Sequence, residues 1–206
     1  MKRICSVIAL VLATALTAQA QQYERGQWDF VAGISSPPTN YESYFNGSGE
    51  NNFYNLKALY SPYYRDYASS LPVYAEGTWH FDRKRGVGGK LEYLRAIGTA
   101  FDPLTDKEVG EKSLNCVFLT VNYERIWWQW SWGAFKSRIG AGLSFMVGRN
   151  PDSSLWSSVT PVIDFVPYSF VFGKRVYVVM EEALNSSYMT DNYMLPEMRF
   201  GIGYRF

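Results

Sequence analysis

The stretch Met198-Arg199-Phe200-Gly201-Ile202-Gly203-Tyr204-Arg205-Phe206 alternates strictly between two kinds of residue. Large apolar or aromatic side chains occupy the even positions, and Arg or Gly occupies the odd ones. With Glu197 in front, the odd positions form a charged face. Because successive side chains of a β-strand point to opposite faces, this period of two predicts a strand over 197–206. The same pattern elsewhere in the chain decides the fold class.

Seven earlier segments repeat this period of two. The predicted strands are 27–35, 72–81, 87 to about 98, 113–125, 135–147, 157–168 and 174–183. Their lengths suit tilted membrane-crossing strands, which need about ten residues. Pro161 and Pro167 weaken the segment 157–168, because proline cannot donate to the ladder. After residue 20 no segment approaches the ~20 consecutive apolar residues of a transmembrane helix, so the sequence predicts an all-β chain.

The first twenty residues have the pattern of a secretory signal peptide. Lys2 and Arg3 form its basic start, residues 4–16 form a short apolar region, and Ala18-Gln19-Ala20 offers small residues for cleavage. We therefore expect export from the cytoplasm. Residues 1–20 would be removed, and 21–206 would form one β-barrel domain.

The composition narrows the class of protein. The formal net charge of +1 gives no basic surface for a nucleic acid. Aromatic residues make up 17% of the chain, which suits interfaces where a ring has one wet end and one apolar end. Cys116 would be the only cysteine of the exported chain, so no internal disulfide can form. Because the exported chain offers no transmembrane helix, a closed barrel is the way in which it could span a bilayer.

The predicted connections alternate in length. Those at 36–71, 99–112, 148–156 and 184–196 are long, and those at 82–86 and 170–173 are short; the connection 126–134 is an exception, as long as one of the long group. Short turns on one side and long loops on the other are typical of outer-membrane barrels, whose short turns are periplasmic. The sequence thus predicts an eight-stranded antiparallel up-and-down transmembrane β-barrel with both termini on the periplasmic side.

Alternation alone does not separate a membrane barrel from a soluble one, because the polar face points into the lumen of the first and to water in the second. Three features favour the membrane. Glycines on the charged face (Gly140, Gly142, Gly201, Gly203) suit a narrow lumen filled by a few long side chains. Aromatic residues near strand ends indicate an interfacial girdle: Trp79, Phe81, Tyr123, Trp127, Trp128, Trp130 and Trp132. The third is the final strand. A soluble exported barrel carrying an apolar ligand stays open as an alternative.

The charged face predicts a network of ion pairs in the lumen. Eight strands enclose an interior only just wide enough for side chains, so paired charges would plug it. The predicted members are Glu76, Lys90, Glu92, Glu124, Arg138, Asp164, Glu181, Arg199 and Arg205, and the same face carries Asp29, Lys136 and Glu197. A small-molecule pore or transporter is the alternative.

The last nine residues resemble the terminal strand of outer-membrane β-barrel proteins. In those families the terminal aromatic and the alternating apolar residues are read by the barrel-assembly machinery, which implies this role for Phe200, Ile202, Tyr204 and Phe206. With the export signal and the loop alternation, the whole mature chain resembles the small OmpA/OmpX-type barrels. The resemblance implies a Gram-negative outer membrane with its lipid and lipopolysaccharide as surroundings. It implies no particular activity, since the family includes adhesins and structural anchors. The long first loop and the Trp-rich connection 126–134 depart from compact members and leave the strand number open.

No catalytic, cofactor or metal site is expected. His80 is the only histidine and has no visible partner for acid–base work, which favours a hydrogen-bonding role in the lumen. One His and one distant Cys lack the spacing of metal ligands. The segment 36–71 is expected to be an extracellular loop.

That loop is rich in Tyr among Gly, Asn and Ser, as in adaptable recognition surfaces. Its candidate binding residues are Tyr41, Tyr44, Tyr54, Tyr60, Tyr63 and Tyr64; anchoring of these rings among lipid headgroups is the alternative. We expect a monomer with a structural or surface-interaction role, no enzyme activity and no nucleic-acid partner.

Overall fold

The computed structural model describes residues 23–36, 63–102, 104–150, 152–185 and 195–206. The predicted signal peptide lies outside them. The described strands are β1 (Trp28–Ser35), β2 (Tyr63–Ser69), β3 (Val73–His80), β4 (Arg85–Phe101), β5 (Glu108–Trp130), β6 (Gly133–Arg149), β7 (Leu155–Gly173), β8 (Val176–Asn185) and β9 (Leu195–Arg205). Among these residues, no helix is long and apolar enough to cross a membrane.

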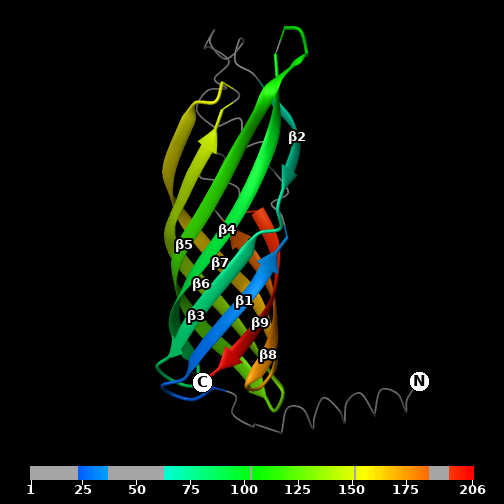
Figure 1. Ribbon diagram of the computed structural model, residues 1–206. Coiled ribbons are helices and arrows are strands. Elements are labelled where there is room, and N and C mark those ends of the chain that lie inside the picture. The colour runs from blue at the N-terminus through cyan, green and yellow to red at the C-terminus, as the bar shows by residue number, and fades with distance from the viewer. Residues whose placement is uncertain (1–22, 37–62, 103, 151, 186–194) are drawn as a thin grey trace, which may run out of the picture.

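Eight strands close into one antiparallel ring (Figure 1). Its order is β4-β3-β1-β9-β8-β7-β6-β5, and β5 pairs back onto β4. The first and last strands meet at the seam, where Ala32 lies opposite Ile202. β2 lies outside this ring of eight: it pairs with the far part of β4, beyond the part that pairs with β3. The predicted all-β, eight-stranded up-and-down barrel is confirmed.

Several predicted boundaries are wrong. β5 runs to Trp130 and β6 begins at Gly133, so the exceptional connection 126–134 is a short turn flanked by strands. A bulge between Ile126 and Trp128 causes the error, because it leaves Trp127 and Trp128 both exposed and breaks the period of two. β2 lies within the predicted loop 36–71, and the predicted turn 170–173 belongs to β7.

Two of the long connections are also shorter than predicted, since only 102–107 and 150–154 remain of 99–112 and 148–156. With the corrected boundaries, the connection between β5 and β6 is short, and long and short connections alternate without an exception. Short turns now join β3 to β4, β5 to β6 and β7 to β8 at one end of the barrel, here called the turn end. The opposite end is called the loop end. The C-terminus lies at the turn end, near the start of β1 (Figure 1).

The burial of the side chains shows which face of each strand points outward and which points into the barrel. On β9, Ile202 is 66% exposed on the outside, whereas Arg199 is fully buried inside. The other exposed outward residues include Trp28, Phe30, Leu91, Leu119, Val121, Ile139, Val159 and Phe200. The apolar face therefore points outward and the charged face inward. A soluble barrel with an apolar ligand inside would need the opposite arrangement.

Aromatic rings gather on the outside at the turn end. The rings of Trp132 and Phe172 stack with centroids 6.0 Å apart, and those of Trp128 and Phe135 stack at 5.3 Å. Trp79 contacts Phe81 at 6.1 Å. This is the position of the predicted girdle, and it suits the boundary between headgroups and hydrocarbon.

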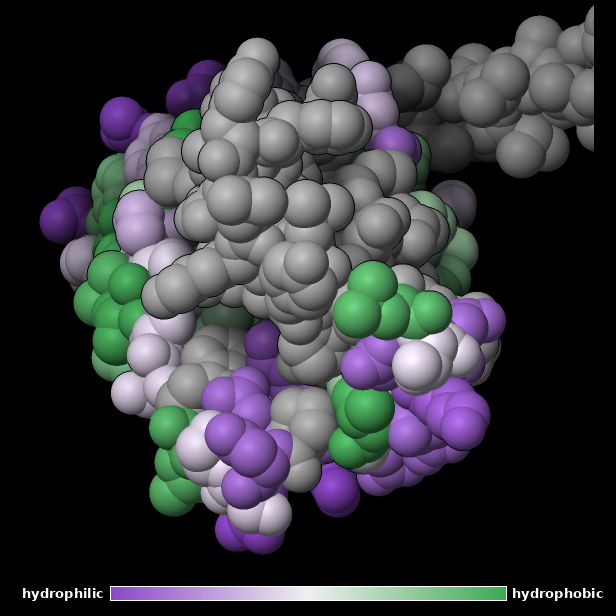
Figure 2. All heavy atoms as spheres, turned by 90° about the horizontal axis from the view of Figure 1, so that it is seen from above, coloured by the Kyte–Doolittle hydropathy of each residue, from purple (hydrophilic) through white to green (hydrophobic). Residues whose placement is uncertain are grey.

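The strands on the two sides of the barrel differ in length. β4, β5, β6 and β7 have 17, 23, 17 and 19 residues, whereas β1, β3, β8 and β9 have 8, 8, 10 and 11. A tilted strand needs about 9–11 residues to cross a membrane. β4–β7 therefore extend well beyond the shorter strands at the loop end (Figure 1). We call this extension, residues 94–101, 108–118, 143–149 and 155–163, the projecting wall. Figure 2, seen from this end, shows hydrophilic residues gathered on its described tips.

Candidate functional site

The interior of the ring contains all nine residues of the predicted lumen network. None of them is more than 5% exposed. Asp29, Lys136 and Glu197, from the same face, are buried with them. The side chains form three clusters, which follow one another from the turn end to the loop end.

The first cluster closes the turn end. Arg205 holds Asp29 with two hydrogen bonds, from Nε to Oδ1 at 2.8 Å and from Nη2 to Oδ2 at 3.0 Å. His80 is fully buried, and its Nε2 lies 3.4 Å from Asp29 Oδ2. The Tyr23 ring lies over the Arg205 guanidinium, with Cζ 3.9 Å from the ring centroid, in a cation–π contact. The Tyr23 backbone N–H donates to Gln129 Oε1 at 3.1 Å, so the segment before β1 lies across the mouth of the barrel.

The second cluster lies in the middle of the lumen. Lys136 Nζ donates to Glu124 Oε2 at 2.6 Å. Arg138 donates from Nη1 to Glu76 Oε1 at 2.6 Å and from Nη2 to Glu181 Oε2 at 3.0 Å. Since β6 and β3 are not neighbours in the ring, the pair of Arg138 with Glu76 spans the lumen instead of running along its wall.

The third cluster lies nearer the loop end. Arg199 Nη2 donates to Asp164 Oδ1 at 2.7 Å and to Glu197 Oε2 at 2.9 Å. Lys90 Nζ lies 2.8 Å from Glu92 Oε2 and 3.2 Å from Asp164 Oδ2. β4 and β7 are also separated in the ring, so this cluster crosses the lumen as well. Burying charges is tolerable only when they are paired in this way.

Inward glycines make room for tyrosine rings that the sequence did not identify as lumen residues. A Cβ added to Gly201 would lie 2.6 Å from Tyr74 Oη, and one added to Gly203 would overlap the ring of Tyr177. Both tyrosines are almost fully buried. The glycines were expected to suit a narrow lumen, but their ring partners depend on strand register, which the alternation does not reveal. Tyr23 was missed because it precedes the first alternating segment.

The other predicted site residues are only partly described. Tyr41, Tyr44, Tyr54 and Tyr60 lie outside the described residues. Tyr63 and Tyr64 belong to β2 and pair with β4, instead of lying in a loop.

The four residues of the predicted assembly signal, Phe200, Ile202, Tyr204 and Phe206, follow β9 to the end of the chain. Phe206 N–H donates to Trp28 O at 2.9 Å, and its ring contacts Phe30 at 5.6 Å. The last residue therefore contributes to the seam between β9 and β1. Its recognition during assembly stays a prediction.

The described residues contain no group of three or more His, Cys, Asp or Glu arranged to hold a metal ion. Cys116 is a free, buried thiol on β5.

Comparison with known proteins shows the fold. No family model and no curated protein matches the chain. Ail, the attachment invasion locus protein of Yersinia pestis, in complex with the heparin analogue sucrose octasulfate, matches with a TM-score of 0.51 and 11% identity over 88% of this chain and 99% of that one. OprG from Pseudomonas aeruginosa matches with a TM-score of 0.47 and 12% identity, over 90% and 98% of the two chains. The N-terminal β-barrel domain of Pseudomonas aeruginosa OprF matches at 0.43 and 9%, over 89% and 100%. At these identities the likeness to Ail concerns the fold: this chain has the fold of the small eight-stranded outer-membrane barrels, as the alternating segments, the connection lengths and the resemblance of the last nine residues predicted.

Proposed function

We propose that this protein is a Gram-negative outer-membrane β-barrel with a closed lumen and a structural or cell-surface interaction role. One observation carries the proposal: large apolar side chains cover the outside, while seven acidic and five basic side chains are buried among the described residues inside. An apolar belt of this extent is unfavourable in water and favourable in lipid. Lipid and lipopolysaccharide are then its immediate surroundings.

The paired interior supports a closed lumen over the alternative of a pore. Arg138 and Lys90 each bond to carboxylates across the barrel, so an ion path would require these pairs to separate. Separation would leave buried charges unpaired, which is costly. In planar bilayers the purified protein should show no steady conductance. Large steady conductance would instead establish a small-molecule pore.

We also propose that the protein has no enzymatic activity. His80, the one histidine, is fully buried at the turn end with Tyr23 and Asp29 against it, and no substrate could reach it there. Its place supports a role in packing the lumen.

The projecting wall supports the surface role. Its β4–β5 tip carries Asp102, Asp106, Glu108 and Glu111 against Lys107 and Lys112. Ail has been crystallised with a heparin analogue, but an excess of acidic residues does not favour a sulfated sugar on this tip. We propose that any ligand of this tip is neutral or cationic.

The outward residues of β9 support recognition of the chain during assembly. Phe200 and Ile202 are exposed along the strand, and Phe206 ends the seam. Phe206→Ala should lower the amount of folded protein in the membrane while the purified variant still refolds.

The oligomeric state we propose is a monomer, which light scattering in detergent would test.

Membrane fractionation with heat-modifiable gel mobility tests residence in the membrane and barrel closure together.

Orientation is tested by cysteine labelling with a membrane-impermeant maleimide on intact cells. Thr105→Cys, on the exposed β4–β5 tip, should be labelled, and Lys84→Cys, on the β3–β4 turn, should not; native Cys116 is buried and adds little background. Release of the protein with the soluble periplasm would contradict the proposal, and labelling of Lys84→Cys alone would reverse the orientation.

A further inference from the structure

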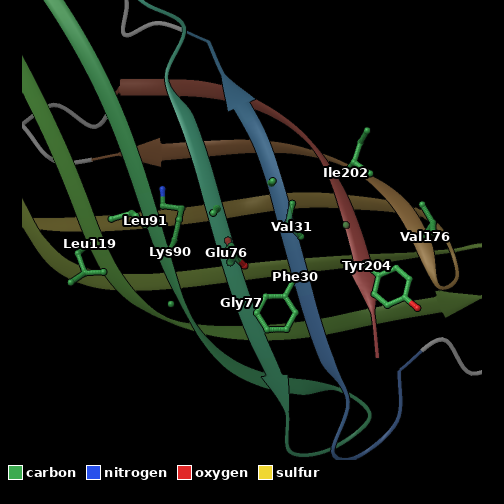
Figure 3. Close-up of a pocket in the computed structure, with 14 residues that line it drawn as sticks. Phe30, Val31, Glu76, Gly77, Lys90, Leu91, Leu119, Val176, Ile202 and Tyr204 are labelled. Atoms are coloured by element: carbon green, nitrogen blue, oxygen red, sulfur yellow. The ribbon is translucent and has the colours of Figure 1, made fainter.

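A hollow interrupts the apolar outer surface where β1, β3 and β4 meet (Figure 3). Its floor consists of small outward residues at adjoining register positions: Ala32 pairs with Ala75, and Gly77 pairs with Gly89. The surface recedes here because these residues carry a methyl group or only hydrogen. The hollow has a volume of about 720 Å³, within the ~300–1,000 Å³ typical of sites for small molecules.

Both flanks of the hollow are apolar. Leu91 and Leu119 stand on one side, and Ile202 and Tyr204 stand on the other (Figure 3). The Phe30 ring lies over Gly77 and narrows the space, since a Cβ added there would be 3.1 Å from that ring. An apolar floor between two apolar flanks matches a hydrocarbon chain and offers little to a polar ligand.

A cationic side chain lies at the turn-end border of the hollow. Val176 and Tyr204 line the hollow, and Arg175 directly precedes Val176. Arg175 is exposed, and its Cζ lies 5.3 Å from the centroid of the Tyr204 ring. Within the part of the chain that the structure describes, no acidic side chain forms an ion pair with Arg175. Lys174 beside it is also exposed.

A phospholipid has the matching arrangement of charge and hydrocarbon. Its phosphate lies at the membrane surface, where basic residues attract it, and its acyl chains lie in the apolar layer next to that surface. We propose that the hollow binds one phospholipid of the periplasm-facing leaflet, with an acyl chain on the floor of Ala32, Ala75, Gly77 and Gly89 and the phosphate at Arg175. This inference rests on the proposed residence in an outer membrane. A second copy of the chain could fill an apolar hollow, but it would leave the cation at its border unexplained.

Binding of the acyl chain in the hollow is tested with a photoactivatable phosphatidylglycerol that carries a diazirine on its acyl chain. In vesicles of phosphatidylglycerol and phosphatidylethanolamine that contain the folded barrel, crosslinks should concentrate on peptides around Ala75 and Gly89. Gly89→Leu fills the floor, and an added Cβ there meets only Thr120 O, at 3.5 Å, so the backbone need not move. This variant should reduce crosslinking in the hollow to the level of the remaining outer surface. Ala141→Leu, the matched change at an exposed position of β6 outside the hollow, should leave it unchanged.

The headgroup half is tested by Arg175→Gln. Native mass spectrometry after extraction in mild detergent should show about fivefold weaker retention of phosphatidylglycerol, the factor expected for one basic residue at an anionic membrane surface. Arg83→Gln, at an exposed position on the β3–β4 turn, should retain the lipid like the wild type. Excess inorganic phosphate should not compete, because it lacks the acyl chain.

Crosslinks spread evenly over the outer surface, or unaffected by Gly89→Leu, would overturn the site. A wild-type dimer that Gly89→Leu converts to a monomer, measured by light scattering, would assign the hollow to a second copy instead. Heat-modifiable gel mobility of each variant distinguishes failure of the lipid site from failure of the proposed function. A folded, membrane-inserted barrel without bound lipid would defeat the site alone, whereas a chain that does not insert would defeat the proposed function.

Discussion

The inner face of β5 changes its chemistry along a single strand. Within the closed ring it carries Thr120, Asn122 and Glu124, whereas on the projecting wall it carries Leu114, Cys116 and Phe118. All six side chains are almost fully buried. β4 changes one inward position closer to the loop end, from Lys90 and Glu92 to Leu94 and Ala96, since Glu92 lies opposite Phe118.

The difference shows where a barrel can bury charge. Inside the closed ring, an ionisable side chain faces strands on the opposite side, and Arg138 finds Glu76 there. On the projecting wall, the described ladders join only β2 and β4–β7, so a charged side chain has few strands facing it. An unpaired buried charge is far more costly than a buried apolar group. On β4 and β5 the inner face therefore becomes apolar where the ring ends.

Arg138→Ala should have the largest effect on stability. It leaves Glu76 and Glu181 buried without their shared cation, and loss of one partner of a buried pair costs about 3–5 kcal/mol. Equilibrium unfolding by guanidinium from lipid vesicles measures this loss. Arg85→Ala is the control, because Arg85 pairs with Asp82 on the exposed β3–β4 turn, where solvent screens such pairs and they contribute little to stability. Equal losses for the two variants would contradict the distinction between paired interior and exposed turn.

Leu114→Ala tests the apolar half of the comparison. Leu114 is fully buried on the projecting wall, and truncation of such a leucine costs about 2–5 kcal/mol. We expect a value at the lower end and a local effect, because the affected strands extend beyond the ring. Hydrogen exchange should increase in β4, β5 and β6 near the loop end and stay unchanged around Arg138. Leu119→Ala, on the exposed outer face of β5, is the matched control and should not raise exchange at the loop end. A uniform increase would show that the two halves unfold together.

The contrast between regions also explains how far the sequence could predict them. Strands with unbroken alternation, such as 197–206, were found with the correct face inward. Two of the errors arose where bulges break the period of two, at Ile126/Trp128 and in β2, where the register shifts between Arg65 and Ala68. Pro167 fits into β7 because both neighbouring ladders shift register around it.

The membership of the charge network was predictable, but its partners were not. A period of two identifies which side chains point inward. It contains no information on which strands face each other across the lumen, and Arg138 and Glu76 are 62 positions apart. The apolar inner face of β4 and β5 on the projecting wall was missed for a related reason: the alternation looks the same whether an inward residue meets a closed ring or an open wall.

Tyr23→Ala tests the closure at the turn end, with an intermediate effect. It removes the ring that covers Arg205 and contacts His80, and a desolvated cation–π contact contributes about 2 kcal/mol. Tyr23→Phe is the matched control, because the Tyr23 hydroxyl has no hydrogen-bond partner among the described residues and the ring would remain. Thermal unfolding in detergent should therefore distinguish the two variants. If Tyr23→Phe lost as much stability as Tyr23→Ala, the cation–π contact would not be the cause.

The smallest effect on stability is expected from Asp102→Ala, at the tip of the projecting wall, which lies outside the membrane. Hydrogen bonds from the backbone N–H groups of Thr105 and Leu104 hold the pKa of the Asp102 carboxyl below its ordinary value. A carboxyl whose pKa is lower in the folded state stabilises that state above the unfolded pKa, and the contribution is lost as the pH falls through the folded pKa. Because Asp102 is half-buried and lies on the β4–β5 connection, only this connection should respond. An NMR titration of Asp102 in the folded and the denaturant-unfolded protein measures the two pKa values, and proteolysis at Lys107 should accelerate in Asp102→Ala at neutral pH. Identical titration of Asp102 in both states would mean that these hydrogen bonds do not persist in solution, and the tip would then be ordered by its strands alone.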